Sequence, residues 1–213
     1  MKNSQIYKML MVLALVLSLV IIGVGVFNFV GLQDNDDNTT VSRPDSFQNE
    51  FFVIGRNPTA FQIENFNALT EALEADELDE VLIADLVTRA FIIDFFTWSN
   101  KEGSWDVGGQ QFVYNHGLFF MNATTWYYAE LDLFLERYGQ ENLPKVVSIQ
   151  TNPMFAGWIE VDGSTFRSFY VEAVWEYEPN SILNPNQFQQ RAYFTLINNQ
   201  AKFEIISFFD AWD

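Results

Sequence analysis

The residues whose chemistry could serve catalysis or binding gather between Phe91 and Gly117, in the stretch FIIDFFTWSNKEGSWDVGGQQFVYNHG. Asp94 stands among Ile, Phe and Trp side chains, a glycine-rich break follows it, and His116 is the single histidine of the chain. Carboxylate and imidazole groups are common proton carriers near neutral pH. The stretch therefore predicts either an active site or a packed corner of a binding fold.

His116 has two interpretations. A Ser-His-Asp arrangement would have to use it, but the chain has no nucleophile elbow of the G-x-S-x-G kind. The letters YNHG around it are typical of a helix start or a turn, where Asn and His hydrogen-bond backbone groups. We therefore favour a capping or packing role for His116 over a functional one.

The composition limits other kinds of chemistry. The chain contains no cysteine, which excludes a disulfide framework, a thiol nucleophile and a thiolate metal site. A single histidine also rules out the usual His-rich zinc sites. We therefore predict no metal site and no cofactor, and we favour a non-enzymatic protein.

The charge of the chain limits its partners. The net charge is −17 at pH 7, and every acidic residue comes after the first thirty positions. Such a surface repels phosphate backbones, so we do not expect nucleic acid as a partner. It favours cations or basic protein surfaces and keeps the domain soluble.

An uncharged apolar run from Met9 to Leu32 predicts a membrane-spanning helix, with the lipid bilayer as its partner. The run would measure about 36 Å as a helix, against a hydrocarbon core of about 30 Å. A cleavable signal peptide is the alternative, but its apolar part usually covers only about 7–15 residues and ends at a small-residue cleavage site. No such site follows here, so we expect a retained anchor.

The flanking charges predict the topology of this anchor. Lys2 and Lys8 precede the span and acidic residues follow it, so the positive-inside rule places residues 1–8 in the cytoplasm. Residues 33–49 are polar and acidic, which is typical of a flexible stalk. Residues 50–213 would then form an extracytoplasmic domain of a single-pass protein of the cell membrane.

Helical patterns fill the first half of that domain. We expect a short helix from Ile63 to Glu74 and a longer, largely buried one from Glu77 to Trp98, separated by an acidic restart. A further helical segment spans Val113 to Gly139, with Gly139 as its C-cap and Gly117 as a candidate interruption. These patterns predict two or three helices.

From Lys145 onward the hydrophobic period changes to two, which predicts a run of antiparallel strands. The predicted strand segments are Lys145–Thr151, Met154–Val161, Thr165–Glu178 and the two arms of residues 188–209. Asp162-Gly163 favours the positive φ of a hairpin turn, and the second hairpin is expected to turn around Asn198-Asn199. Helices followed by these strand segments, of which four are long, indicate an α+β fold, with the helices on one side of the sheet.

The alternation within the strands predicts which side chains are buried. The side chains expected in the core are those of Phe169, Val171, Ala173, Trp175, Tyr177, Ala192, Phe194, Leu196, Phe203 and Ile205. Ser168, Glu172 and Glu176 are expected on the opposite, solvated face.

This order of elements, over about Asn65 to Asp210, resembles the cone-shaped superfamily of nuclear-transport-factor-like, or steroid-isomerase-like, domains. The resemblance implies helices packed on a curved four-stranded antiparallel sheet. Behind one membrane span and an acidic stalk, the chain looks like the bitopic scaffold subunits of bacterial conjugation and type IV secretion. In those families the domain usually serves assembly rather than catalysis.

The resemblance also implies a possible ligand site, because such cones can place an acid and Tyr residues inside a cavity. The catalytic residues would then be Asp94, His116 and Tyr128, and the ligand-binding residues would be Asp94, Trp98, Tyr114, Trp126 and Tyr127. In the favoured alternative, Asp94 points outward or caps the loop that begins at Asn100, since a lone carboxylate is a weak signal.

The aromatic residues also have two interpretations. Tryptophans at positions 98, 105, 126, 158 and 175 either fill the space between helices and sheet or serve a protein interface. Phe208, Phe209 and Trp212 near the end of the chain are either core with a frayed terminus, which we favour, or an interface.

The sequence as a whole therefore predicts a non-enzymatic, membrane-anchored assembly or protein-interaction subunit. Its α+β domain would bind other membrane or envelope proteins, or itself, as part of a secretion, conjugation or envelope complex. The alternative is a small-ligand binder or cone-fold enzyme that works through Asp94 and nearby Tyr residues.

Overall fold

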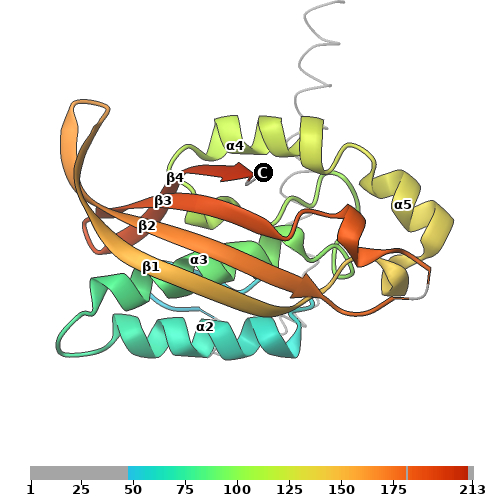
Figure 1. Ribbon diagram of the computed structural model, residues 1–213, viewed down its shortest axis with the longest axis horizontal. Coiled ribbons are helices and arrows are strands. Elements are labelled where there is room, and N and C mark those ends of the chain that lie inside the picture. The colour runs from blue at the N-terminus through green and yellow to red at the C-terminus, as the bar shows by residue number, and fades with distance from the viewer. Residues whose placement is uncertain (1–47, 181, 211–213) are drawn as a thin grey trace, which may run out of the picture. The chain divides into compact units, whose positions relative to one another are not determined.

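The computed structural model describes residues 48–180 and 182–210 (Figure 1). The predicted span from Met9 to Leu32, nearly all of the stalk, and Trp212 lie outside these residues. Within the described ranges, no helix has the length and apolar composition needed to cross a membrane. Four α-helices come first and a four-stranded antiparallel sheet follows, so the α+β prediction is confirmed for this part of the chain.

Helices α2 (Ala60–Leu73) and α3 (Glu80–Phe96) are separated by an acidic turn, as the sequence predicts. Helix α2 begins at Ala60 rather than Ile63, because the Thr59 hydroxyl accepts a hydrogen bond from the Gln62 N–H at 3.1 Å and caps the helix there. Asp79 caps α3 in the same way, by accepting from the N–H groups of Val81 and Leu82, so α3 covers Glu80–Phe96 rather than Glu77 to Trp98. Both helices therefore start where a side chain satisfies their free N–H groups.

Helix α3 is the central helix of the domain. It contacts α2 and also β1, β2 and β4, and nearly every residue from Ile83 to Phe96 is buried. Its Phe rings meet rings from the sheet: Phe96 lies 4.5 Å from Trp175 between centroids, and Phe91 lies 5.8 Å from Phe194. The space between α3 and the sheet is therefore filled by aromatic side chains.

The third predicted helix, Val113 to Gly139, is wrong as one continuous segment. It consists of α4 (His116–Asn122), a π-helical turn (Ala123–Tyr127) and α5 (Leu131–Tyr138). Gly117 lies inside α4 and does not interrupt it. The chain leaves α-geometry because the Tyr128 N–H donates to the Ala123 carbonyl at 2.8 Å, five residues back. Gly139 is the C-cap of α5, as predicted.

The sheet has the order β1-β2-β3-β4 (Figure 1). Its strands are β1 (Val146–Val161), β2 (Ser164–Tyr177), β3 (Arg191–Asn199) and β4 (Lys202–Asp210). The two segments predicted before Asp162 are a single strand, β1, which contains Pro153. A proline is tolerated there because β1 is an edge strand, where an N–H group can be missing without breaking a ladder.

The two hairpin turns differ in how well the sequence predicts them. Asp162 and Gly163 have φ of 50° and 76°, so the first turn is confirmed. The second turn is at Gln200 and Ala201, with φ of 54° and 73°, and not at Asn198-Asn199. Asn198 instead accepts a hydrogen bond from the Ala201 N–H at 2.8 Å and so stabilises the turn that follows it.

The predicted core face of the sheet is confirmed, since all ten side chains expected there are buried. Ser168 is an exception on the opposite face, because it is buried although the alternation predicts exposure. It lies in one row with Ile197 and Glu204 across β2, β3 and β4, and both of those side chains are buried as well. Part of the outer face is therefore covered.

The burial of these outer-face side chains is consistent with the bend of the β1–β2 hairpin, whose end extends beyond β3 and β4 in Figure 1. The register shifts between Phe155 and Gly157, and Gly157 has φ of 104°, so a bulge bends the hairpin there. The Phe166 ring lies 6.5 Å from the Tyr114 ring, while the Tyr114 N–H donates to the Ile205 carbonyl at the far edge of the sheet. The hairpin end thus reaches from the β1 edge across to the β4 edge.

Candidate functional site

The structure separates the predicted site residues into two groups. Asp94, Trp98 and Tyr128 lie in and around a buried polar cluster, whereas Trp126 and Tyr127 line a surface groove. His116 and Tyr114 belong to neither the cluster nor the groove. Each group is built by different elements, and each supports a different kind of chemistry.

Asp94 lies on α3 and is buried, so it does not point outward. One carboxylate oxygen accepts a hydrogen bond from the Gly109 N–H at 2.7 Å. The other accepts from the Lys101 ammonium at 2.9 Å and from the Gln62 amide at 3.5 Å. Lys101 is itself buried, so this is a buried ion pair that holds the loop after α3 against the helix.

Tyr128 binds the same loop from the other side. Its hydroxyl donates to the Phe95 carbonyl at 2.6 Å and accepts from the Gly108 N–H at 3.3 Å. Burial raises the pKa of Tyr128 well above its ordinary value, so the hydroxyl stays protonated and can donate. Tyr128 and Asp94 therefore accept hydrogen bonds from two consecutive N–H groups, those of Gly108 and Gly109 respectively.

We call Asp94, Lys101, Gly108, Gly109 and Tyr128 the loop anchor. Glycine is required at both central positions: a Cβ atom at Gly108 would overlap the Asp94 carbonyl group, and Gly109 has φ of 75°. The sequence analysis identified Asp94 and Tyr128 but missed Lys101 and the two glycines as their partners. The signal was present, because a buried acid requires a cation or several N–H groups nearby.

The remaining candidates outside the groove, His116, Tyr114 and Trp98, do not belong to the loop anchor. His116 is exposed as the first residue of α4, and Asn115 caps that helix by accepting from the Leu118 N–H at 3.1 Å. Tyr114 lies beside the β1–β2 hairpin, where a hydrogen bond with Asp162 raises its pKa. Trp98 packs with its ring centroid 5.8 Å from that of Tyr128, at the edge of the loop anchor.

The surface groove lies between α4, the π-helical turn and β4. We call it the α4–β4 groove and define it by Leu118, Phe119, Asn122, Trp126, Tyr127 and Phe208. It consists of two hollows of about 190 Å³ and 460 Å³, and both are lined by Phe119, Asn122 and Phe208. In Figure 1, α4 runs along the side of the sheet where β4 lies.

The floor and the rim of the groove are positioned differently. Phe208 packs 5.4 Å from Phe91 and 6.0 Å from Tyr127 between ring centroids, so the floor belongs to the aromatic core. Trp126, in contrast, is 77% exposed. Since π-helical turns recur at functional sites, the turn that carries Trp126 marks this rim as a candidate binding surface.

The groove is also electrically neutral. No Asp, Glu, Lys or Arg occurs from Val107 to Ala129, nor from Ile205 to Phe209, in a chain whose net charge is −17. The six residues that define the groove include no carboxylate and no amine. The groove can therefore bind apolar and aromatic groups, but it offers no strong acid, base or nucleophile for chemistry.

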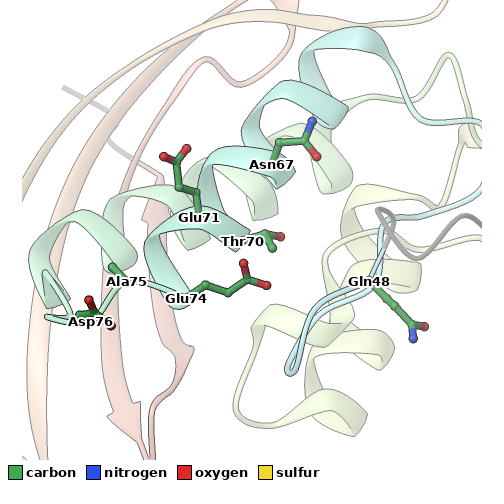
Figure 2. A pocket seen from close by; sticks show the side chains of 7 residues that line it. All are labelled: Gln48, Asn67, Thr70, Glu71, Glu74, Ala75 and Asp76. Atoms are coloured by element: carbon green, nitrogen blue, oxygen red, sulfur yellow. The ribbon is translucent and has the colours of Figure 1, made fainter.

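A separate, acidic hollow lies along the C-terminal end of α2. Figure 2 shows the carboxylates of Glu71, Glu74 and Asp76 on α2 and the turn after it, with Gln48 on a separate segment. Within residues 48–180 and 182–210, no three acidic or histidine side chains are placed to hold a metal ion together. We therefore regard this hollow as part of the solvated acidic surface.

The comparisons with known proteins add no assignment. No protein-family model, no curated protein and no solved structure matches the chain. The geometry of the loop anchor and of the α4–β4 groove is thus the basis for a functional proposal.

Proposed function

We propose that the chain is a non-enzymatic, membrane-anchored assembly or protein-interaction subunit that displays its α+β domain outside the cytoplasm. The observation that carries this proposal is the α4–β4 groove, an uncharged aromatic surface with a 77% exposed tryptophan on a strongly acidic chain. Exposed Trp and Phe side chains around a hollow are typical of protein interfaces.

The membrane part of the proposal is supported by the sequence. The apolar run from Met9 to Leu32 has the length of a membrane span, and Lys2 and Lys8 precede it. The order of helices and then four antiparallel strands is compatible with the assembly domains of bitopic conjugation and secretion subunits that the sequence resembles. A role in a secretion, conjugation or envelope complex follows as the finer form of the proposal.

The cone-fold enzyme or ligand binder has less support. Asp94 and Tyr128 do lie together, as that alternative requires, but their polar atoms bind Lys101, Gly108, Gly109 and the Phe95 carbonyl. Aromatic rings of α3, β2 and β3 fill the space between helix and sheet in which a cone would hold its ligand. These contacts favour a structural role for the acid.

Site-specific photo-crosslinking in intact cells tests the interaction role. A photoreactive phenylalanine analogue at Trp126 is expected to give defined crosslinked products, because this side chain projects from the groove rim. The matched control is the same analogue at Trp105, which is 60% exposed but does not line the groove. Equal products from both positions would contradict the groove as the interaction site.

Membrane fractionation of the same cells tests the anchor. We expect the full chain in the membrane fraction after an alkaline carbonate wash, and a C-terminal tag that protease removes from the outside of intact cells. Recovery in the soluble fraction, or a protected tag, would contradict the proposed anchor and topology.

A further inference from the structure

The end of the β1–β2 hairpin carries large apolar side chains that the fold does not bury. Trp158 is 67% exposed and Phe155 is 46% exposed. Trp158 pairs in register with Arg167, which is two residues from the buried Phe169, so this pair lies on the face of the hairpin that is turned towards α3. The Arg167 guanidinium bonds the Glu80 carboxylate of α3 at 2.6 Å. The hairpin and the start of α3 therefore border one surface.

The two rings are held in place by Arg167. Its guanidinium carbon lies 5.0 Å from the Phe155 ring centroid and 6.0 Å from the Trp158 ring centroid. Such contacts between a cation and an aromatic face are favourable. Phe155 also packs 5.7 Å from Phe169 between centroids, which joins it to the core. The protein thus positions the Trp158 ring but leaves most of its surface accessible.

A hollow of about 560 Å³ opens beside Arg167 and Phe169. Leu78, in the turn before α3, is 45% exposed and supplies an apolar rim. The lining combines apolar and charged side chains, those of Leu78, Asp79, Glu80, Val81, Arg167 and Phe169. We call Leu78, Glu80, Phe155, Trp158 and Arg167, together with this hollow, the α3–hairpin surface. It shares no residue with the α4–β4 groove.

The α3–hairpin surface is bordered by carboxylates. Residues 71–80, with the sequence EALEADELDE, hold six acidic residues and no basic one. Among the described residues, Glu80 is the only one of these six that forms an ion pair. Glu160 is exposed and follows Trp158 by two residues, so alternation places it on the same face of β1. The rings and the hollow therefore lie in a strongly negative electrostatic field.

This charge decides between the possible occupants. A second copy of the chain would bring the same carboxylates to the surface, and the phosphate groups of nucleic acid or anionic lipid would be repelled as well. Within residues 48–180 and 182–210 no three acidic or histidine side chains are placed to hold a metal ion, which would also leave the rings uncovered. A basic protein segment fits better, because arginine stacks on aromatic rings and bonds carboxylates through two N–H groups.

We infer that the α3–hairpin surface binds a basic segment of another protein. A cationic side chain of that segment lies on the Trp158 ring near Glu160, and a neighbouring apolar side chain fills the hollow beside Leu78. This second binding surface goes beyond the proposed function, which rests on the uncharged α4–β4 groove. Because opposite charges attract the two proteins, binding weakens as salt screens them.

A labelled peptide of three Arg-Leu repeats tests this inference on the full chain in nanodiscs of zwitterionic lipid. Fluorescence anisotropy gives the dissociation constant, with empty nanodiscs as the blank. We expect Trp158→Gln to weaken binding by about tenfold, since an aromatic side chain at the centre of a contact contributes most of its energy. Trp105→Gln is the matched control, because Trp105 is 60% exposed but does not line the hollow.

A second pair of variants repeats the contrast. Phe155→Gln should weaken binding too, whereas Phe209→Gln should not, because Phe209 is 62% exposed on β4 and does not line the hollow. A thermal melt confirms that each variant is folded. Equal binding by Trp158→Gln and Trp105→Gln would overturn the inference.

A matched peptide of three Arg-Ser repeats separates the hollow from the charge around it. This peptide keeps the cations but has no apolar side chain, so it should bind about tenfold more weakly than the Arg-Leu peptide. Raising the salt from about 50 mM to about 500 mM should weaken the binding of both. Equal affinities for the two peptides, or binding that salt does not change, would overturn the inference.

Photo-crosslinking in intact cells separates this inference from the proposed function. With the photoreactive analogue at Trp158, we expect crosslinked peptides that mass spectrometry identifies as basic, and the analogue at Trp105 is again the control. Products from Trp158 without products from Trp126 would contradict the groove and leave this inference standing, and the reverse result would overturn it. Crosslinks from Trp158 to acidic peptides, to lipid or to a second copy of the chain would overturn it as well.

Discussion

The loop anchor and the α4–β4 groove lie on neighbouring elements but leave different groups free. In the loop anchor, the oxygens of Asp94 and the hydroxyl of Tyr128 are bonded to groups of the same chain. In the groove, the side chain of Trp126 remains 77% exposed. A site whose polar atoms are all bonded internally contributes to stability, whereas exposed apolar side chains around a hollow are available to a partner. Substitutions in the two regions should therefore affect different measurements.

The largest effect is expected from Lys101→Met, which leaves the Asp94 carboxylate buried without its cation. The expected loss is about 3–5 kcal/mol in the free energy of unfolding, measured by urea denaturation. Lys145→Met is the control, because the Lys145–Glu178 pair is half-exposed and its loss should cost about 0–1 kcal/mol. Equal losses in the two variants would contradict the conclusion that the Lys101–Asp94 pair stabilises the fold more than the surface pair Lys145–Glu178.

A glycine pair gives the next largest contrast. Gly108→Ala should cost about 1–3 kcal/mol, because the new methyl group overlaps the Asp94 backbone, which cannot move without disturbing α3. Gly117→Ala in α4 should instead stabilise the protein by about 0.5–1 kcal/mol, since nothing lies within 4 Å of the added carbon. Thermal unfolding of both variants measures the difference, and a stable Gly108→Ala protein would show that the loop is not fixed as described.

Tyr128→Phe should cost about 1–3 kcal/mol at neutral pH, because the Phe95 carbonyl and the Gly108 N–H lose a buried partner. The pH dependence has a definite sign. Burial raises the pKa of folded Tyr128 above the unfolded value of about 10, so its contribution is fully present below that pH and is lost as the pH rises further.

Above pH 10 the unfolding free energy of the native protein should fall by about 1.4 kcal/mol per pH unit for each such tyrosine. Burial also raises the pKa of Tyr177, which therefore adds to the same decline. In Tyr128→Phe, the unfolding free energy should fall less steeply with pH, by the contribution of about one proton. Urea denaturation across this pH range measures the slope. An unchanged slope would mean that Tyr128 ionises normally in the folded state.

The smallest effect on stability is expected in the groove. Trp126→Ala should change the unfolding free energy by less than about 0.5 kcal/mol, because the side chain is 77% exposed. The same variant should reduce the recovery of partner proteins with the full chain from detergent-solubilised membranes, since large aromatic side chains dominate interface energies. A stability loss similar to that of Lys101→Met would show that Trp126 belongs to the fold rather than to a binding surface.

The sequence predicts the fold better than the site, for a physical reason that particular residues illustrate. The ten core side chains of the sheet follow from alternation along single strands, which is a local property. The helix starts after Thr59 and Asp79 are set by local hydrogen bonds as well, although the sequence predicted these starts at Ile63 and Glu77 rather than at Ala60 and Glu80. The partners of Asp94 and the exposure of Trp126 depend on residues that meet only after folding, and the sequence left both questions open.

The sequence by itself determined the order of helices and strands, the antiparallel α+β class and the buried face of the sheet, because each follows from periodicity and capping within short segments. The tertiary structure decided that Lys101 and Gly109 bind Asp94, that the β1–β2 hairpin reaches Tyr114, and that α4 leaves a neutral groove beside β4. These features depend on how separate elements pack, and packing is set by contacts between residues that are distant in the chain.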